Sequence, residues 1–355
     1  MLNLVADYAM IIITILVFIL IFGLIVFVHE LGHFLVAKRT GVVVEEFAFG
    51  FPPKIFAWKR GETRYAINLL PLGGYVKLKG EDGGDKEAGS FVNKKARVRA
   101  SILLAGIVMN LILSWVILTV IIILPKSVRG DGAVFVSAVL ENTPAAEAGI
   151  KTGDAITKID NLNISDGATL HSATQDKKDS SIKLNIRRNG NTIEKNIKLS
   201  DGDAPLGVAT STFSLSDISV SAYNAPVVAI QEIGRVIWGY IQFFGGIFGI
   251  GSTEVSADSV SGPVGIYGVV AQFVALGWVY VLFVTAQLSL AIAIFNLIPF
   301  PALDGGRVLF VFLKKIFKGK YITLQFEQIA HTVGFFILMG MFAIVTYRDI
   351  LKLIK

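Results

Sequence analysis

The feature that most constrains the fold is a run of residues, 9–28, without a single charged side chain. About twenty apolar residues are enough for one helix to cross a bilayer core of roughly 30 Å. Three further uncharged runs follow along the chain, at 100–124, 281–296 and 328–347. With 53% hydrophobic residues and a mean hydropathy of +0.64, the chain is too apolar for an ordinary soluble domain. We therefore expect a multi-pass α-helical membrane protein with four spans, embedded in a lipid bilayer.

Charge and cysteine content exclude several other classes. The net charge is +6, and thirteen of the Lys and Arg residues fall between Lys38 and Arg99, where they alternate with large apolar residues beside the spans. This pattern favours anchoring on the cytoplasmic side of a membrane, and no nucleic-acid partner is expected. The chain has no cysteine, which excludes thiol catalysis, disulfides and cysteine-ligated zinc.

A possible metal site follows the first run directly, in the sequence His29-Glu30-Leu31-Gly32-His33. Residues i and i+4 share one face of a helix, so both imidazoles can point at one ion, with Glu30 beside them to take a proton from water. Catalytic zinc sites need such ligands, an open position and a carboxylate that is not a ligand. The alternative is two structural histidines and a chance glutamate. Ionisable groups at the end of a span are costly and usually functional, which favours the metal site.

A catalytic zinc usually has three protein ligands, so a third is expected elsewhere in the chain. Two other histidines exist, His171 in a polar region and His331 at the start of the last run, and we expect both to be structural or solvated. Asp304 is the better candidate, because it follows a proline-broken apolar run and precedes two glycines that permit close approach. The alternative role for Asp304 is the N-cap of a helix over 305–316.

The segment at 45–80 predicts a small antiparallel sheet. Residues 59–62 form a plausible hairpin turn between apolar stretches at 55–58 and 63–70. Alternation then marks 75–79, with Val76 and Leu78 expected on one side and Tyr75 and Lys77 on the other. An ordinary cytoplasmic β-hairpin remains the alternative.

From 126 to 211 the composition becomes that of a β-rich soluble domain. Strands are expected at 134–140, 156–159 and 182–187, with a turn at Asn189-Gly190. The stretch 141–150, followed by Gly153-Asp154, resembles the helix-and-turn signature of bacterial-protease PDZ domains.

The stretch at 225–250 is apolar, yet a polar face of Asn224, Gln231, Arg235 and Gln242 favours an amphipathic helix lying on the membrane surface. If this helix does not span, the first and third spans both run from outside to inside, and Asp304 ends at a depth similar to that of the two histidines.

Four regions are then expected. They are a first membrane catalytic region at 1–125, a PDZ domain at 126–211, a juxtamembrane amphipathic helical region at 212–277 and a second membrane catalytic region at 278–355.

Two motifs together resemble a known family. His-Glu-x-x-His at 29–33, paired with Asn-x-x-Pro-x-Pro-x-Leu-Asp-Gly at 296–305, looks like the site-2 protease family of intramembrane zinc metalloproteases. The inserted PDZ domain resembles that of its bacterial branch, the RseP and RasP type. Two departures are visible, a single PDZ domain and Ile107 in place of a proline often found in the second span.

The resemblance implies a set of site residues. One zinc ion per chain would be held by His29, His33 and Asp304, with Glu30 as the catalytic base. Asn296 matches the asparagine thought to hold substrate near the metal, and residues 261–265 match the motif that precedes the third span. A membrane-dipping β-loop would bind substrate by strand addition through Gly74, Tyr75, Val76, Lys77 and Leu78.

The resemblance also implies an activity and a location. Peptide bonds would be hydrolysed within transmembrane segments of single-pass membrane proteins, such as an anti-sigma factor cut beforehand by another protease, or signal-peptide remnants. The protein would lie in the bacterial cytoplasmic (inner) membrane, with the PDZ domain outside and the active site near the cytoplasmic face. One alternative is a membrane protease with a glutamate as third ligand, although the nearest candidate, Glu327, precedes the last run. A membrane metal transporter or a PDZ scaffold is the non-enzymatic alternative.

Overall fold

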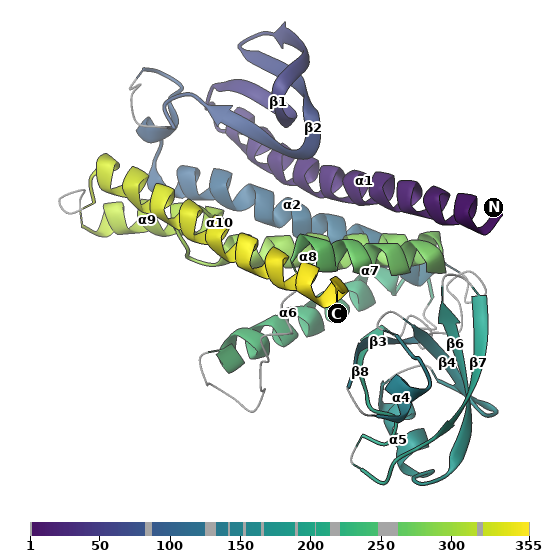
Figure 1. The fold of residues 1–355 in the computed structure, drawn as a ribbon. Helices are drawn as coiled ribbons and strands as arrows, with labels where there is room; N and C mark the ends of the chain where they lie inside the picture. The colour runs from purple at the N-terminus through teal and green to yellow at the C-terminus, as the bar shows by residue number, and fades with distance from the viewer. Residues whose placement is uncertain are drawn as a thin grey trace. The chain divides into compact units, whose positions relative to one another are not determined.

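The computed structural model describes residues 2–81, 87–124, 133–140, 143–151, 154–164, 167–188, 191–202, 204–213, 221–247, 262–317 and 322–354. The chain divides into two compact units (Figure 1). The first contains residues 1–117, 230–267 and 285–355, and the second contains 118–229 and 268–284. The region boundaries expected from the sequence stay a prediction.

Among the described residues, four helices are long and apolar enough to cross a membrane, and each covers all or nearly all of one uncharged run. They are α1 (Leu2–Arg39), α2 (Ala96–Ile123), α8 (Trp278–Leu297) and α10 (Leu324–Ile354). Helix α1 continues without a break through His29 and His33, which confirms that both histidines lie on one helix. Helix α2 is likewise continuous at Ile107, one of the two departures noted from the sequence.

Helices α6 and α7 directly precede α8 in the chain. Helix α6 (Ala225–Ile247) exposes Trp238 and Ile241 beside a Glu232–Arg235 ion pair of 2.5 Å. Among the described residues, α6 does not belong to the helices with the length and composition of a span, and its place on the membrane surface stays a prediction. Helix α7 (Pro263–Leu276) is apolar but shorter than a span.

The N-terminus of α7 is tied to the last helix by one carboxylate. Asp349, 8% exposed, accepts a hydrogen bond of 2.8 Å from the Gly265 backbone N–H at the start of α7. A Cβ on Gly262 would lie 2.8 Å from Asp349 Oδ2 and 3.0 Å from Val345, so a larger residue there would have to displace these side chains. The Gly-Pro-Val-Gly segment of the predicted motif is therefore a helix start that is capped by a distant side chain.

Strands β1 (Val44–Arg60) and β2 (Thr63–Leu78) form an antiparallel sheet that packs against α1 (Figure 1). The hairpin turn predicted after Arg60 is confirmed, since Arg60 pairs with Thr63. The sheet then folds back on itself, because Phe47 pairs with Tyr65 on one side and with Val76 on the other. Residues 74–78 pair only with 44–49 among the residues that the structure describes, so they form an edge of the sheet.

A buried apolar cluster joins this sheet to three helices. Its members come from α1, both strands, η1 (Phe91–Asn93), α2 and α9 (Asp304–Ile316), and the fully buried ones include Ala37, Val44 and Ile102. Helices α1 and α2 also approach at backbone distance, because a Cβ on Gly32 would lie 2.4 Å from the Ala105 carbonyl oxygen. The residues between the two histidines therefore have a fixed position against α2.

The β-rich portion of the second unit is a single antiparallel sheet with strand order β7-β6-β4-β3-β8, and β5 pairs with β4. Its elements are β3 (Ala133–Val139), α4 (Pro144–Glu147), β4 (Ala155–Ile159), β5 (Leu162–Asn163), α5 (Gly167–Gln175), β6 (Ser181–Arg188), β7 (Asn191–Lys198) and β8 (Val208–Phe213). The three predicted strands are confirmed. The predicted turn at Asn189-Gly190 and the residues Glu141, Asn142 and Gly153 lie outside the described residues.

An internal ion pair closes the turn that precedes β4. Asp154 is 1% exposed and accepts hydrogen bonds from Arg188 Nε and Nη2, each at 2.6 Å, and from the Lys151 backbone N–H at 2.9 Å. The carboxylate raises the pKa of the Arg188 guanidinium above its ordinary value. The Asp of the Gly-Asp signature therefore has a structural role in holding the turn.

Candidate active site

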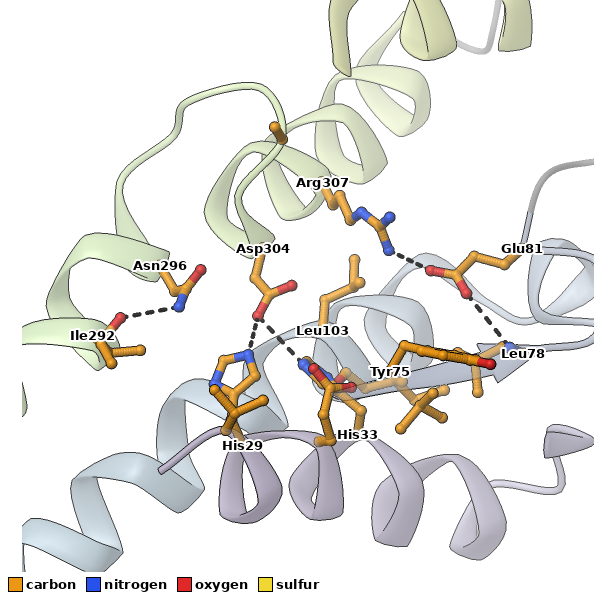
Figure 2. Close-up of a pocket in the computed structure, with 15 residues that line it drawn as sticks. His29, His33, Tyr75, Leu78, Glu81, Leu103, Ile292, Asn296, Asp304 and Arg307 are labelled. Carbon is orange, nitrogen blue, oxygen red and sulfur yellow. Dashed lines mark hydrogen bonds and ion pairs between the residues drawn. The ribbon is translucent and has the colours of Figure 1, made fainter. Parts of the chain in front are cut away.

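Asp304 lies between the two histidines of α1 (Figure 2). Its Oδ2 atom is 2.9 Å from His29 Nε2 and 3.3 Å from His33 Nε2, and the three possible ligand atoms all lie within 4.8 Å of one another. The histidines are 8% and 9% exposed. Tetrahedral ligands about 2.0–2.1 Å from a zinc ion lie about 3.3–3.4 Å apart, so the donor set is compact enough for one such ion.

The alternative role of Asp304 as a helix cap is wrong. Helix α9 begins at Asp304 itself, the preceding Leu303 takes the N-cap position, and no side chain caps the helix. The carboxylate faces the imidazoles and not the backbone of its own helix.

The other ring nitrogen of each histidine also has a defined neighbour. His33 Nδ1 lies 2.8 Å from the carbonyl oxygen of Ile102, and His29 Nδ1 lies 3.4 Å from the side-chain nitrogen of Asn110. Both neighbours belong to α2. The rings therefore turn Nε2 toward Asp304, which is the orientation that metal-binding histidines obtain from their outer partners.

Three glycines create the space for this arrangement. A Cβ on Gly106 would lie 2.5 Å from His33 Nε2 and 2.7 Å from His29 Nε2, so the imidazoles rest directly on the backbone of α2. A Cβ on Gly305 or Gly306 would lie 2.4 Å from the Leu297 oxygen or 2.1 Å from the Phe300 oxygen. The two glycines after Asp304 therefore allow α9 to start against the end of α8.

His331 has a structural role, as expected. Its Nδ1 atom accepts a hydrogen bond of 2.9 Å from the Ala302 backbone N–H, two residues before Asp304. Ala302 has φ +80°, a backbone conformation that L-residues rarely adopt, so the bond stabilises an unfavourable turn. A Cβ on Gly334 would also lie 2.5 Å from the Pro301 oxygen. Helix α10 thus fixes the loop that carries Asp304.

A cavity of about 390 Å³ opens beside the three possible ligands. Glu30, Asn296, Tyr75, Val76 and Leu78 are among the predicted site residues that line it. The predicted β-loop contacts also include Gly74, where a Cβ would lie 3.4 Å from Glu30 Cγ, so this strand passes directly over the glutamate.

The cavity wall includes residues that the predicted alternation placed on opposite sides of the strand. Tyr75 lines the cavity together with Val76 and Leu78, although strict alternation placed it on the opposite side. Residues 74–77 pair one by one with residues 49–46, so the pairing is regular here and the cavity is reached from both sides of the strand. The Lys77 side chain does not line the cavity, and its Nζ atom lies 2.9 Å from Glu45.

Tyr75 is held by a carboxylate from the neighbouring strand. Its hydroxyl donates to Glu46 Oε1 at 2.8 Å, and Lys54 lies 2.6 Å from the same oxygen. Burial favours the neutral form of Glu46, but the hydrogen bonds from Lys54 and Tyr75 outweigh it and keep the pKa of Glu46 below its ordinary value. Burial and the Glu46 carboxylate in turn raise the pKa of Tyr75. The hydroxyl is therefore a neutral donor at neutral pH.

An ion pair that no sequence pattern predicts forms one wall of the cavity. Arg307, one turn beyond Asp304, pairs with Glu81, and Glu81 Oε2 also accepts the Leu78 backbone N–H at 3.4 Å (Figure 2). Both charged residues also line a second cavity of about 220 Å³. No spacing rule links residues 226 positions apart, so the sequence offered no signal for this pair.

Asn296 lies on α8, one helical turn beyond Ile292, and its side chain faces the same cavity (Figure 2). The amide nitrogen donates to the Ile292 carbonyl oxygen at 3.0 Å, which fixes the direction of the side chain. The structure therefore brings Asn296 to the metal side of the cavity, opposite the strand at 74–78.

Comparison with known proteins agrees with this geometry. The family model of peptidase family M50 matches residues 17–341. The chain belongs to peptidase family M50. This confirms the predicted site-2 protease family, and the protein is a metalloprotease.

Several relatives align over nearly their whole length. A protein of Clostridium acetobutylicum, named as a zinc metalloprotease, is 33% identical over 94% of this chain and 96% of its own length. Zinc metalloprotease RasP of Bacillus licheniformis is 29% identical over 96% of this chain and 99% of its own. The regulator of sigma-W protease RasP of Bacillus subtilis is 28% identical with the same coverage. These names support the metalloprotease over the transporter and scaffold alternatives.

One solved structure resembles a segment of the chain. The PDZ domain of the SdrC-like protein from Listeria monocytogenes is 27% identical and covers 23% of this chain and 88% of its own, with a TM-score of 0.21.

Replacement of Gly106 tests how tightly the metal site is built. Gly106→Ala should weaken zinc binding at least about tenfold, because the new Cβ would displace both imidazoles, although Ala normally stabilises a helix interior relative to Gly. Gly340→Ala in α10, where a Cβ would meet open space, is the matched control and should bind zinc as the parent does. Parental zinc affinity of Gly106→Ala in a chelator competition assay would show that the imidazoles do not bind metal in this position.

Proposed function

We propose that this metalloprotease hydrolyses peptide bonds within transmembrane segments of single-pass membrane proteins. The proposal depends chiefly on one observation: a largely buried His-His-Asp donor set shares a cavity with an edge strand of the β-sheet. The same cavity contains a carboxylate, Glu30, that is not among the donors. Metal-dependent peptide hydrolysis needs these components in one place.

The metal is proposed to be one zinc ion per chain, held by His29, His33 and Asp304. Two imidazoles and a carboxylate match the ligand types of catalytic zinc, and the surface of Gly106 leaves room beside both rings. When bound, zinc would polarise a peptide carbonyl and lower the pKa of a water molecule.

Glu30 is proposed as the general base. It follows His29 on α1 and lines the cavity beside the donor set, so its carboxylate can take a proton from the attacking water and pass it to the leaving amine. Asn296 lines the other side and is proposed to hold the substrate backbone close to the donor set.

A helical substrate must unwind before its backbone can enter the cavity, because its amides are paired within the helix. The edge strand at 74–78 offers replacement hydrogen bonds. Lys79 N–H donates to Val43 at 2.9 Å, toward β1, whereas Leu78 N–H turns to Glu81. Successive N–H groups of a strand point to opposite sides, so the Val76 N–H should also point away from β1. We propose that an unwound substrate segment pairs with this edge through Gly74, Tyr75, Val76, Lys77 and Leu78.

The proposed setting is the bacterial cytoplasmic (inner) membrane, with α1, α2, α8 and α10 as four spans. The basic segment at 38–99 favours an active site near the cytoplasmic face, and the region at 126–211 then lies outside. We propose that this region is a PDZ domain that binds a new C-terminus or excludes substrates with bulky ectodomains. The name of the Bacillus subtilis relative, a regulator of sigma-W protease, supports an anti-sigma factor, cut beforehand by another protease, as substrate. Signal-peptide remnants are the other proposed substrate class.

Glu30→Gln separates metal binding from catalysis. The variant should keep one zinc per chain but hydrolyse a transmembrane substrate at least about 10²-fold more slowly, because only the base is removed. Glu45→Gln, which alters a carboxylate paired with Lys77 away from the cavity, is the control and should cleave at the parental rate. Parental activity of Glu30→Gln, with zinc content measured on the same sample, would remove Glu30 from the mechanism.

A proline at Val76 tests substrate binding by the edge strand. Val76→Pro removes an N–H that points away from the sheet, so cleavage of a stable helical substrate should fall about tenfold or more while zinc content stays normal. A substrate with helix-breaking residues should be cleaved with a smaller loss, since it needs less unwinding. Val76→Thr keeps the N–H and should be close to the parent. If Val76→Pro cleaves the stable helix at the parental rate, this edge does not hold the substrate.

Single cysteines in this cysteine-free chain test the membrane arrangement. A cysteine at Lys183, exposed on β6, should react with a membrane-impermeant maleimide added outside intact cells, whereas one at Lys86 should react only after the membrane is opened. Labelling of both positions from the same side would contradict the four-span arrangement.

A further inference from the structure

Nδ1 of each histidine needs a hydrogen-bond acceptor if Nε2 binds the metal. A neutral imidazole has a single N–H, so a ring that offers the Nε2 lone pair to an ion carries its proton on Nδ1. For His33 the acceptor is the Ile102 carbonyl oxygen at 2.8 Å, which can only accept. For His29 the neighbour is the side-chain amide of Asn110 at 3.4 Å, which can either donate or accept. The orientation of the amide therefore determines which nitrogen of His29 carries the proton and which offers a lone pair to the metal.

The amide orientation in the structure leaves an oxygen without a partner. Asn110 is fully buried, and its Oδ1 atom has no hydrogen bond among the described residues. Its Nδ2 atom faces His29 Nδ1, an arrangement that would put the imidazole proton on Nε2, against Asp304. The nitrogen and oxygen of an amide have nearly the same shape, so a half-turn of the group costs no space. It would bring Oδ1 against His29 Nδ1 and leave Nε2 free for metal.

The amide group of Asn110 is not what holds α2 against α8. The backbone carbonyl of Asn110 makes that contact, accepting the Ser289 hydroxyl at 2.9 Å. One turn further, Ser114 donates to the Ala286 carbonyl oxygen at 2.6 Å. The side chain of Asn110 is buried against a possible metal ligand and takes no part in the helix contact. Burial of an amide costs free energy unless its polar atoms have partners, so another role is expected for this side chain.

We propose that Asn110 is a positioning residue for the metal centre. Its side-chain oxygen accepts the Nδ1–H of His29 and so fixes the tautomer that offers Nε2 to the ion. The inference rests on the zinc site of the proposed function, but it concerns zinc affinity and does not depend on which substrate is cleaved. Partners of this kind typically change metal affinity 10–100-fold when they are removed.

The test measures zinc affinity of the purified full-length chain by competition with a chromophoric chelator. Asn110→Leu removes the acceptor and should weaken zinc binding about 10–100-fold. Asn110→Asp keeps an acceptor and removes the donor, so it should bind zinc as tightly as the parent or more tightly. Ser114→Ala is the matched control, because it removes a buried polar group from the same helix without touching His29, and should change the affinity less than about threefold.

Asn110→Asp tests whether the side chain at this position acts as a hydrogen-bond acceptor. If Asn110→Asp binds zinc as weakly as Asn110→Leu, an acceptor at this position does not support the site, which would overturn the proposal. Parental affinity in Asn110→Leu, or an equal loss in Ser114→Ala, would also overturn it. Should Asn110→Leu fail to fold in a thermal unfolding assay without metal, Asn110→Asp decides alone. The visible spectrum of the cobalt-substituted chain should be unchanged in Asn110→Asp. Loss of proteolysis with these zinc results intact would count against the proposed function only.

Discussion

The meeting of one carboxylate with two imidazoles determines how the first unit is built. Asp304 and His29 are 275 positions apart in the sequence, and both are largely buried. Buried charge is unfavourable unless it is paired or bound to metal, so these three side chains must be held together by the surrounding fold. Helix α1 supplies the histidines, α2 supplies the outer partners of both rings, and α9 supplies the aspartate. The apolar cluster shared by these helices and the sheet keeps this spacing.

The site also requires close approach of the helices around it, and glycines make this approach possible. Gly32 brings α1 against the backbone of α2, Gly106 lets both histidine rings rest on α2, and Gly305 brings α9 against the end of α8. Small residues at helix contacts are the usual means by which membrane helices pack, because apolar side chains gain little by leaving lipid. Here the same residues leave room for the metal ligands, so packing and site formation depend on the same positions.

Much of this arrangement could be predicted from the sequence. The uncharged runs predicted the four long helices, because run length and charge are properties of single segments. The spacing of His29 and His33 predicted a shared helical face, and the apolar, proline-broken context of Asp304 predicted its meeting with them. The partner of His331 and the Glu81–Arg307 pair were not predictable, since each joins segments that share no pattern. The contribution of Tyr75 to the cavity was not predictable either, since alternation gives the side of a strand and not the shape of the cavity around it.

The central claim is that Asp304 completes a zinc site with the two histidines of α1. Zinc stoichiometry after extensive dialysis, measured by elemental mass spectrometry on Asp304→Ala and Glu327→Gln, tests it most directly. Glu327 is the other acid considered as third ligand, and the structure pairs it with Lys314. The account predicts that Asp304→Ala retains well under half an equivalent of zinc and that Glu327→Gln retains one. Full retention by Asp304→Ala, or loss of zinc in Glu327→Gln alone, would contradict it.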